Sequence, residues 1–117
     1  TFELGFMAEK IAARFLESRG HSIIEVNYKK PWGEIDIISK KEGILVFTEV
    51  KASRKIIPGF EPELRANNSK IIKIIRAAKT YLAEKQYDPD QEWQIDIVSI
   101  VLDGEIAKVK HFKNIDI

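Results

Sequence analysis

Cysteine is absent from this sequence of 117 residues. A chain without cysteine forms neither a disulfide framework nor a thiolate metal site, and its composition fits a reducing compartment. No apolar run approaches the roughly 20 residues of a membrane-spanning helix, and the chain does not open on the pattern of a signal peptide. We therefore expect a cytoplasmic protein with no membrane partner.

Glycine and proline are also scarce, with six and four residues. Together with 44% hydrophobic and 32% charged residues, this scarcity excludes a disordered or low-complexity chain and is typical of a globular protein. The length is enough for one hydrophobic core and short for two. We therefore expect one domain over residues 1–117.

The net charge of +1 argues neither for nor against a nucleic-acid partner, but the charges are unevenly distributed. Residues 1–50 carry seven Lys/Arg against eight Asp/Glu, residues 51–85 carry nine against three, and residues 86–117 carry three against seven. The basic middle segment is open to two interpretations, a surface for a polyanion or a helix whose lysines are simply solvated.

The hydrophobic periodicity predicts two helices and five strands. A long loop rich in proline and asparagine should separate the third strand from the second helix. The order is α-β-β-β-α-β-β, an α/β protein whose mixed sheet is flanked by helices. The predicted ranges are helix 2–18, strands 22–30, 34–39 and 44–53, loop 54–69, a helix from 68 or 69 to 85, and two strands within 92–112 joined by a turn at Asp103-Gly104.

Several side chains have predicted places within these elements. The buried stripe of the second helix should consist of Ile71, Ile74, Ile75, Ala78 and Leu82. We expect His21 in a surface turn and His111 on the last strand without a role as a metal ligand. Trp93 should pack in or beside the core, whereas Trp32 could equally stack on a nucleic-acid base.

Acidic residues occur in the most strand-like part of the chain, "GEIDIISKKEGILVFTEVKAS" (33–53). Glu49 and Lys51 are two residues apart and share a strand face, and a hairpin at "KKEG" would bring Asp36 near them. Two carboxylates without a nearby thiolate or imidazole favour Mg²⁺ or Mn²⁺, which suits hydrolysis of a phosphodiester by a bound water. The alternative is a solvent-exposed ion pair with no catalytic role.

The motif pair "GEIDII" and "LVFTEVKAS" resembles the core signature of the PD-(D/E)xK nuclease superfamily, and in particular the YraN-type family of small bacterial proteins. The resemblance extends over nearly the whole chain. The opening "GFMAEKIAARFLESRGHSIIEVNYK", the helix "NNSKIIKIIRAAKTYL" and the closing strands "WQIDIVSI" and "VKHFKNI" are also similar to that family.

This resemblance implies a restriction-endonuclease-like αβββαβ core and a metal-dependent nuclease site that acts on DNA, including branched or damaged forms. It implies that Asp36, Glu49 and Glu9 hold Mg²⁺ or Mn²⁺, and that Lys51 is the catalytic lysine. Among the basic residues, Lys70 matches a position that recurs in the family and would contact a phosphate. Lys73, on the same helix, either belongs to a face that follows the nucleic-acid backbone or is simply solvated. The family usually has an arginine two residues after the lysine, whereas here Ser53 takes that position and Arg54, which follows, would supply the contact.

Two other functions are compatible with the same residues. One is a module that binds nucleic acid or protein without cutting, and the other is a phosphoesterase for a small nucleotide. The complete set of Asp36, Glu49 and Lys51 argues against pure binding, because two carboxylates beside a polyanion weaken binding. A homodimer would suit the cutting of two strands.

Overall fold

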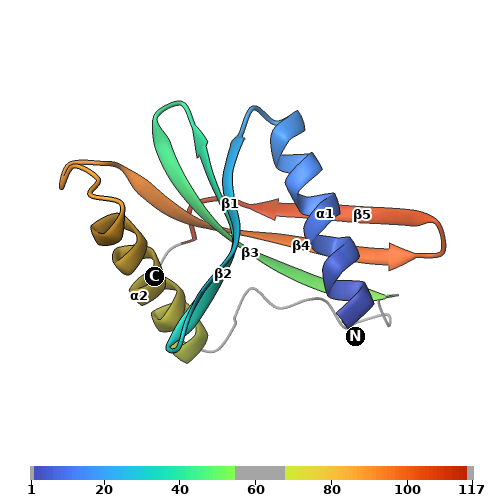
Figure 1. Cartoon of the computed structure of the whole chain (residues 1–117). Helices are drawn as coiled ribbons and strands as arrows, with labels where there is room; N and C mark the ends of the chain where they lie inside the picture. The colour runs from blue at the N-terminus through green and yellow to red at the C-terminus, as the bar shows by residue number, and fades with distance from the viewer. Residues whose placement is uncertain (1, 55–67, 116–117) are drawn as a thin grey trace.

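The computed structural model describes residues 2–54 and 68–115, and its elements follow the predicted order (Figure 1). Most of the predicted loop 54–69 lies outside the described residues. Neither described helix is long and apolar enough to span a membrane. The elements are α1 (Phe2–Ser18), β1 (Ser22–Lys30), β2 (Gly33–Lys41), β3 (Ile44–Arg54), α2 (Asn68–Glu84), β4 (Trp93–Asp103) and β5 (Ile106–Phe112).

The five strands form one mixed sheet in the order β1-β2-β3-β4-β5. Strands β3 and β4 are parallel, and the other neighbours are antiparallel. Because parallel neighbours need a crossover connection, α2 stands between β3 and β4 in the chain. This arrangement confirms the predicted α/β class and is consistent with a restriction-endonuclease-like fold.

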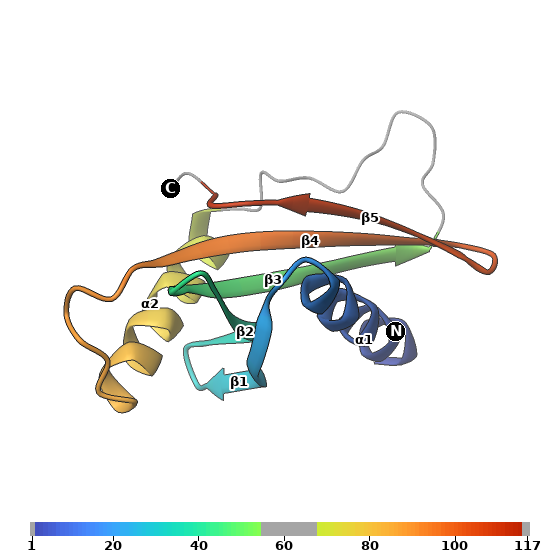
Figure 2. The same cartoon turned by 90° about the horizontal axis from the view of Figure 1, so that it is seen from above.

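The two helices cover opposite faces of the sheet. Ile37 belongs to the cluster that packs against α1, and its neighbour Ile38 belongs to the cluster that packs against α2. Successive residues of a strand point to opposite faces, so the two clusters form two separate cores. In both views the helices stand on either side of the β1–β2 hairpin (Figure 1, Figure 2).

The buried face of α2 differs partly from the prediction. Ile74 and Ala78 are buried as expected, but Ala77 and Tyr81 are buried too, and Ile71, Ile75 and Leu82 are only half-buried. The Tyr81 ring packs edge-on against Tyr28 and Phe47, with ring centroids 5.2 and 5.9 Å apart. The large aromatic side chain therefore sets which side of the helix faces the sheet.

The register between β2 and β3 is fixed by a two-residue turn at Glu42 and Gly43. Both residues have positive φ, 51° and 80°, as the type I′ hairpin turn requires. Lys41 then pairs with Ile44. In the β4–β5 hairpin the prediction was wrong by one residue, because Asp103 pairs with Ile106 and leaves Gly104 and Glu105 as the turn.

Candidate functional site

Strand β2 separates from β3 at Asp36. The described pairing of the two strands runs from Lys41–Ile44 to Ile37–Thr48 and goes no further. Beyond it, the backbone N–H of Val50 donates to the Asp36 carboxylate, with Oδ2 2.7 Å from the nitrogen. A backbone donor in a partly buried strand needs an acceptor, and here a side chain takes the place of the missing strand.

Burial raises the pKa of Asp36 from its ordinary value of 3.8 to about 6. The hydrogen bond from Val50 acts in the opposite direction, and the negative charges of Glu49, Glu9 and Glu34 raise the pKa further. These three carboxylates come from β3, α1 and β2. The fold therefore brings three other acidic side chains within electrostatic range of Asp36, and two of them, Glu49 and Glu9, are the other predicted metal ligands.

Glu49 lies on β3 next to Val50 and is only 8% exposed. Its Oε1 is 3.0 Å from the Lys70 ammonium at the start of α2. Its Oε2 is buried and has no hydrogen-bond partner among the described residues. A buried carboxylate oxygen without a partner is costly, so this atom is a candidate ligand for a cation or a water.

The predicted basic residues do not all gather at this point. Lys51 is half-buried, two residues beyond Glu49 on the same strand face. Lys73 is one helical turn beyond Lys70, and both line a pocket that reaches Glu49. Arg54 is exposed at the end of β3, five residues and therefore roughly 16 Å along the strand from Glu49.

A divalent cation of the magnesium type fits this donor set. Within residues 2–54 and 68–115, no three His, Asp or Glu side chains are grouped closely enough to hold a metal ion by themselves. Mg²⁺ does not need such a cage, because it usually keeps several waters and is bound by one or two carboxylates together with substrate phosphates. Asp36 and the unpartnered oxygen of Glu49 can supply those carboxylates.

Residues 8–100 match the family described as Uncharacterised protein family UPF0102. This chain belongs to UPF0102. Similar relatives include UPF0102 proteins of Campylobacter fetus (41% identical over 111 residues, 95% of this chain and 91% of the relative), Fervidobacterium nodosum (37% over 113 residues, 93% and 78%) and Helicobacter pylori (39% over 109 residues, 93% and 90%). The predicted YraN-type family is thereby confirmed.

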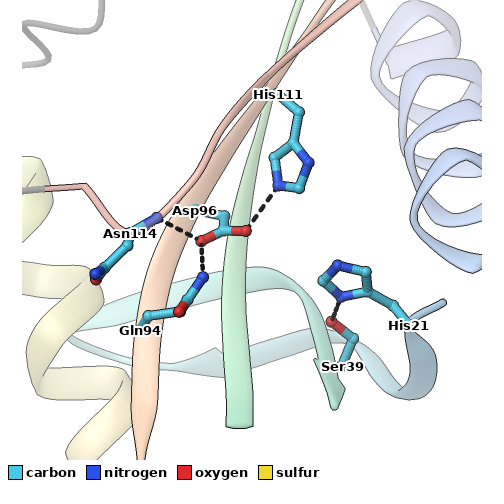
Figure 3. A network of polar contacts seen from close by, with 6 residues as sticks. All are labelled: His21, Ser39, Gln94, Asp96, His111 and Asn114. Carbon is cyan, nitrogen blue, oxygen red and sulfur yellow. Dashed lines mark hydrogen bonds and ion pairs between the residues drawn. The ribbon is translucent and has the colours of Figure 1, made fainter. Parts of the chain in front are cut away.

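This UPF0102 chain contains a second polar cluster that the sequence did not predict (Figure 3). Asp96 on β4 is 1% exposed and has three partners, the His111 ring, the Gln94 amide and the Asn114 backbone N–H, at 2.7, 2.8 and 2.8 Å. Burial alone would raise the pKa of Asp96, but these hydrogen bonds outweigh it and lower the pKa.

The predicted surface position of His21 was wrong. His21 is buried at 7% exposure, and its Nδ1 lies 2.9 Å from the Ser39 hydroxyl, close to the His111 ring (Figure 3). Burial lowers the pKa of His21, and the positive charges of His111 and Lys41 lower it further. This cluster could not be predicted from the sequence, because His21, Asp96 and His111 are far apart in the chain and only the folded sheet brings them together.

The polar cluster is separate from the acidic site. Ser39 shares the strand face of Ile37, and Asp96 shares that of Val98, which places both on the α1 side of the sheet. Glu49 is paired with Lys70 of α2 on the other side. The cluster therefore supports the fold of this UPF0102 protein at a distance from the candidate active site.

The two tryptophans occupy different environments. Trp93 packs edge-on against Phe47, with ring centroids 5.7 Å apart, which confirms its place beside the core. Trp32 lies in the turn between β1 and β2 and lines the same pocket as Glu49.

Proposed function

We propose that this UPF0102 protein hydrolyses phosphodiester bonds of DNA with the help of a divalent cation, Mg²⁺ or Mn²⁺. The proposal is carried by one observation. The carboxylate of Asp36, held by the Val50 N–H, lies within electrostatic range of a buried Glu49 whose second carboxylate oxygen has no partner among the described residues. The resemblance of "GEID" and "EVK" to the PD-(D/E)xK signature supports the same conclusion.

In this proposal Asp36 and Glu49 hold the cation, and Glu9 of α1 adds a third carboxylate to the same region. A bound divalent cation lowers the pKa of its water and offsets the charge that develops on a phosphate. Lys51 orients the attacking water or stabilises the negative charge on the phosphate oxygens. Lys70 and Lys73 hold the DNA backbone by their charge, and Arg54 contacts it farther along β3.

The test compares cutting of branched, single-stranded and duplex DNA, and of RNA, at matched salt with Mg²⁺, Mn²⁺ or EDTA. We expect cutting that needs the metal and that falls at least 100-fold in Glu49→Gln, Asp36→Asn and Lys51→Ala. Glu105→Gln is the matched control, because Glu105 is exposed in the β4–β5 turn. Metal-independent cutting, or cutting that survives Glu49→Gln, would contradict the proposal.

Direct metal binding gives a second readout that does not depend on activity. Titration with Mn²⁺ should show one site that Glu49→Gln weakens at least tenfold and Glu105→Gln does not affect, since Glu49, unlike Glu105, belongs to the acidic group around Asp36. A wild-type protein that binds no Mn²⁺ with or without DNA would exclude the metal-dependent mechanism.

A binding module remains the second candidate, and one contact favours it. The Lys70 ammonium already pairs with Glu49, so a positive charge balances that carboxylate without a metal. Such a module would bind DNA equally well in EDTA and in Mg²⁺, would keep binding after Glu49→Gln and Lys51→Ala, and would cut none of the substrates.

A further inference from the structure

A pocket of about 490 Å³ opens beside Glu49, between the β1–β2 turn and the first two turns of α2. Its volume is within the range of small-molecule sites, about 300–1,000 Å³. Four lysines contribute to its walls against two glutamates, so its charge favours an anion. The residues that matter for the argument are Lys29, Lys70, Lys73, Trp32 and Glu49.

The backbone around Gly33 holds the wall of this pocket in place. A Cβ atom at Gly33 would lie 2.8 Å from the backbone carbonyl oxygen of Lys73, closer than such atoms approach one another. Only glycine therefore allows the β1–β2 turn to lie directly on α2. The close contact fixes the position of Trp32, the residue before Gly33, relative to the lysines of the helix.

Trp32 separates the pocket from a second groove along α2. The Arg76 guanidinium stands over the indole ring at 4.9 Å, and Arg76 lines the second groove but not the pocket. The indole therefore lines both hollows, and the cation that lies over it belongs to the groove. The Nε1 atom of Trp32 is buried and has no partner among the described residues.

We propose that this pocket holds one unpaired nucleotide, with its base against Trp32 and its phosphate on Lys70 and Lys73 next to Glu49. The proposal rests on the nuclease function proposed above and specifies its substrate class. An indole bordering a pocket rich in lysines matches a ligand that is both flat and anionic. In an intact duplex the bases are stacked inside the helix and cannot reach Trp32. The substrate is therefore DNA with a single-stranded or extruded nucleotide.

Tryptophan fluorescence tests this proposal directly, because the sequence contains only Trp32 and Trp93. In a Trp93→Phe protein, emission reports on Trp32 alone. In EDTA, a mixed-sequence single-stranded 12-mer should quench this emission as it binds, and the same 12-mer paired with its complement should not. Binding is followed independently by the anisotropy of a labelled oligonucleotide. Single-strand binding with unchanged Trp32 emission, or equal quenching by the duplex, would overturn the proposal.

Substitution of Trp32 provides the second measurement. Trp32→Ala should lower the affinity for the single strand about ten- to a hundredfold and leave the affinity for the duplex unchanged, since only an unpaired base stacks on the ring. Trp32→Phe keeps an aromatic face and should restore most of the loss. Lys108→Ala, on exposed β5, is the charge control for Lys70→Ala and Lys73→Ala. If Trp32→Ala lowered the affinity for the single strand and for the duplex equally, the proposed nucleotide pocket would be contradicted.

The same proteins distinguish failure of this inference from failure of the nuclease function. If the single strand selectively quenched Trp32 emission but no metal-dependent cutting occurred, the nucleotide pocket would be supported and the nuclease function excluded. If single-stranded and duplex DNA were cut equally and Trp32 emission did not change, the nuclease function would be supported and the nucleotide pocket excluded. Preferential cutting of the single strand that Trp32→Ala abolishes would support both.

Discussion

The Asp36 carboxylate accepts a hydrogen bond from the backbone N–H of Val50, where β2 and β3 separate. Because this carboxylate replaces a strand partner, its position is set by the backbone of β3 and not by a flexible side chain alone. The residue before Val50 is Glu49, so this bond holds the Asp36 carboxylate at the residue that follows Glu49, within electrostatic range of it. The split in the sheet is therefore what builds the candidate metal site.

Asp36 should make the folded protein less stable at neutral pH. Its folded pKa of about 6 lies above the ordinary 3.8, so stability decreases as pH rises from about 4 to 6 and stays lower above that. In Asp36→Asn the amide oxygen still accepts the Val50 N–H, but the charge is gone. The rise in the pKa of Asp36 corresponds to about 3 kcal/mol before solvent screening is taken into account. Because screening reduces this effect, we expect the variant to be about 1–2 kcal/mol more stable than wild type at pH 7.5.

Urea unfolding in EDTA at pH 4 and pH 7.5 checks this expectation. The gain in stability should appear at pH 7.5 and largely vanish at pH 4, where the wild-type Asp36 is itself mostly neutral. Glu105→Gln, which removes an exposed carboxylate from a turn, should change the free energy of unfolding little at either pH. A variant less stable than wild type at pH 7.5 would mean that burial and the neighbouring carboxylates do not destabilise the ionised form of Asp36 in the folded state.

Metal binding should depend on pH through the same carboxyl group. A cation binds the ionised form of Asp36, so it must displace a proton from a group whose pKa is about 6. We expect the affinity for Mn²⁺ to decrease as pH falls from 7 to 5, with close to one proton released per ion near pH 5 and almost none at pH 8. Calorimetry in buffers of different ionisation enthalpy measures this release. If the affinity for Mn²⁺ did not change between pH 7 and pH 5, the ion would bind at a site that does not include Asp36.

Lys70 should have opposite effects on metal and DNA. Its ammonium lies 3.0 Å from Glu49 Oε1 and competes with a cation for that carboxylate. Lys70→Ala should therefore bind Mn²⁺ several-fold more tightly while its DNA affinity falls and the salt dependence of DNA binding decreases by about one charge. Lys108→Ala tests whether any exposed lysine has this effect. Weaker Mn²⁺ binding in Lys70→Ala would show that the ion pair supports the site and does not compete with it.

The sequence predicted the elements that have strong local signals and the residues joined by a short hairpin. The sequence predicted that Asp36 and Glu49 lie close together, because the "KKEG" turn lies between them and the length of a turn fixes the register of the two strands. Lys70 could be placed at a helix N-terminus, but its contact with Glu49 depends on how α2 docks, which the ring of Tyr81 decides. The buried place of His21 depends on partners 18 and 90 residues away, Ser39 and His111, and no local pattern encodes such a contact.

Removal of His111 should destabilise the fold without changing the acidic site. Asp96 is almost fully buried, and loss of the His111 ring would leave its Oδ2 without that partner. We expect His111→Ala to cost about 2–4 kcal/mol in urea unfolding at pH 7.5, and His111→Gln, whose amide can donate from the place of Nε2, to cost clearly less. Affinity for Mn²⁺ should stay at the wild-type value in both variants, because Glu49 lies on the other face of the sheet. Equal costs for Ala and Gln would show that packing of the ring, and not its hydrogen bond to Asp96, stabilises this end of the sheet.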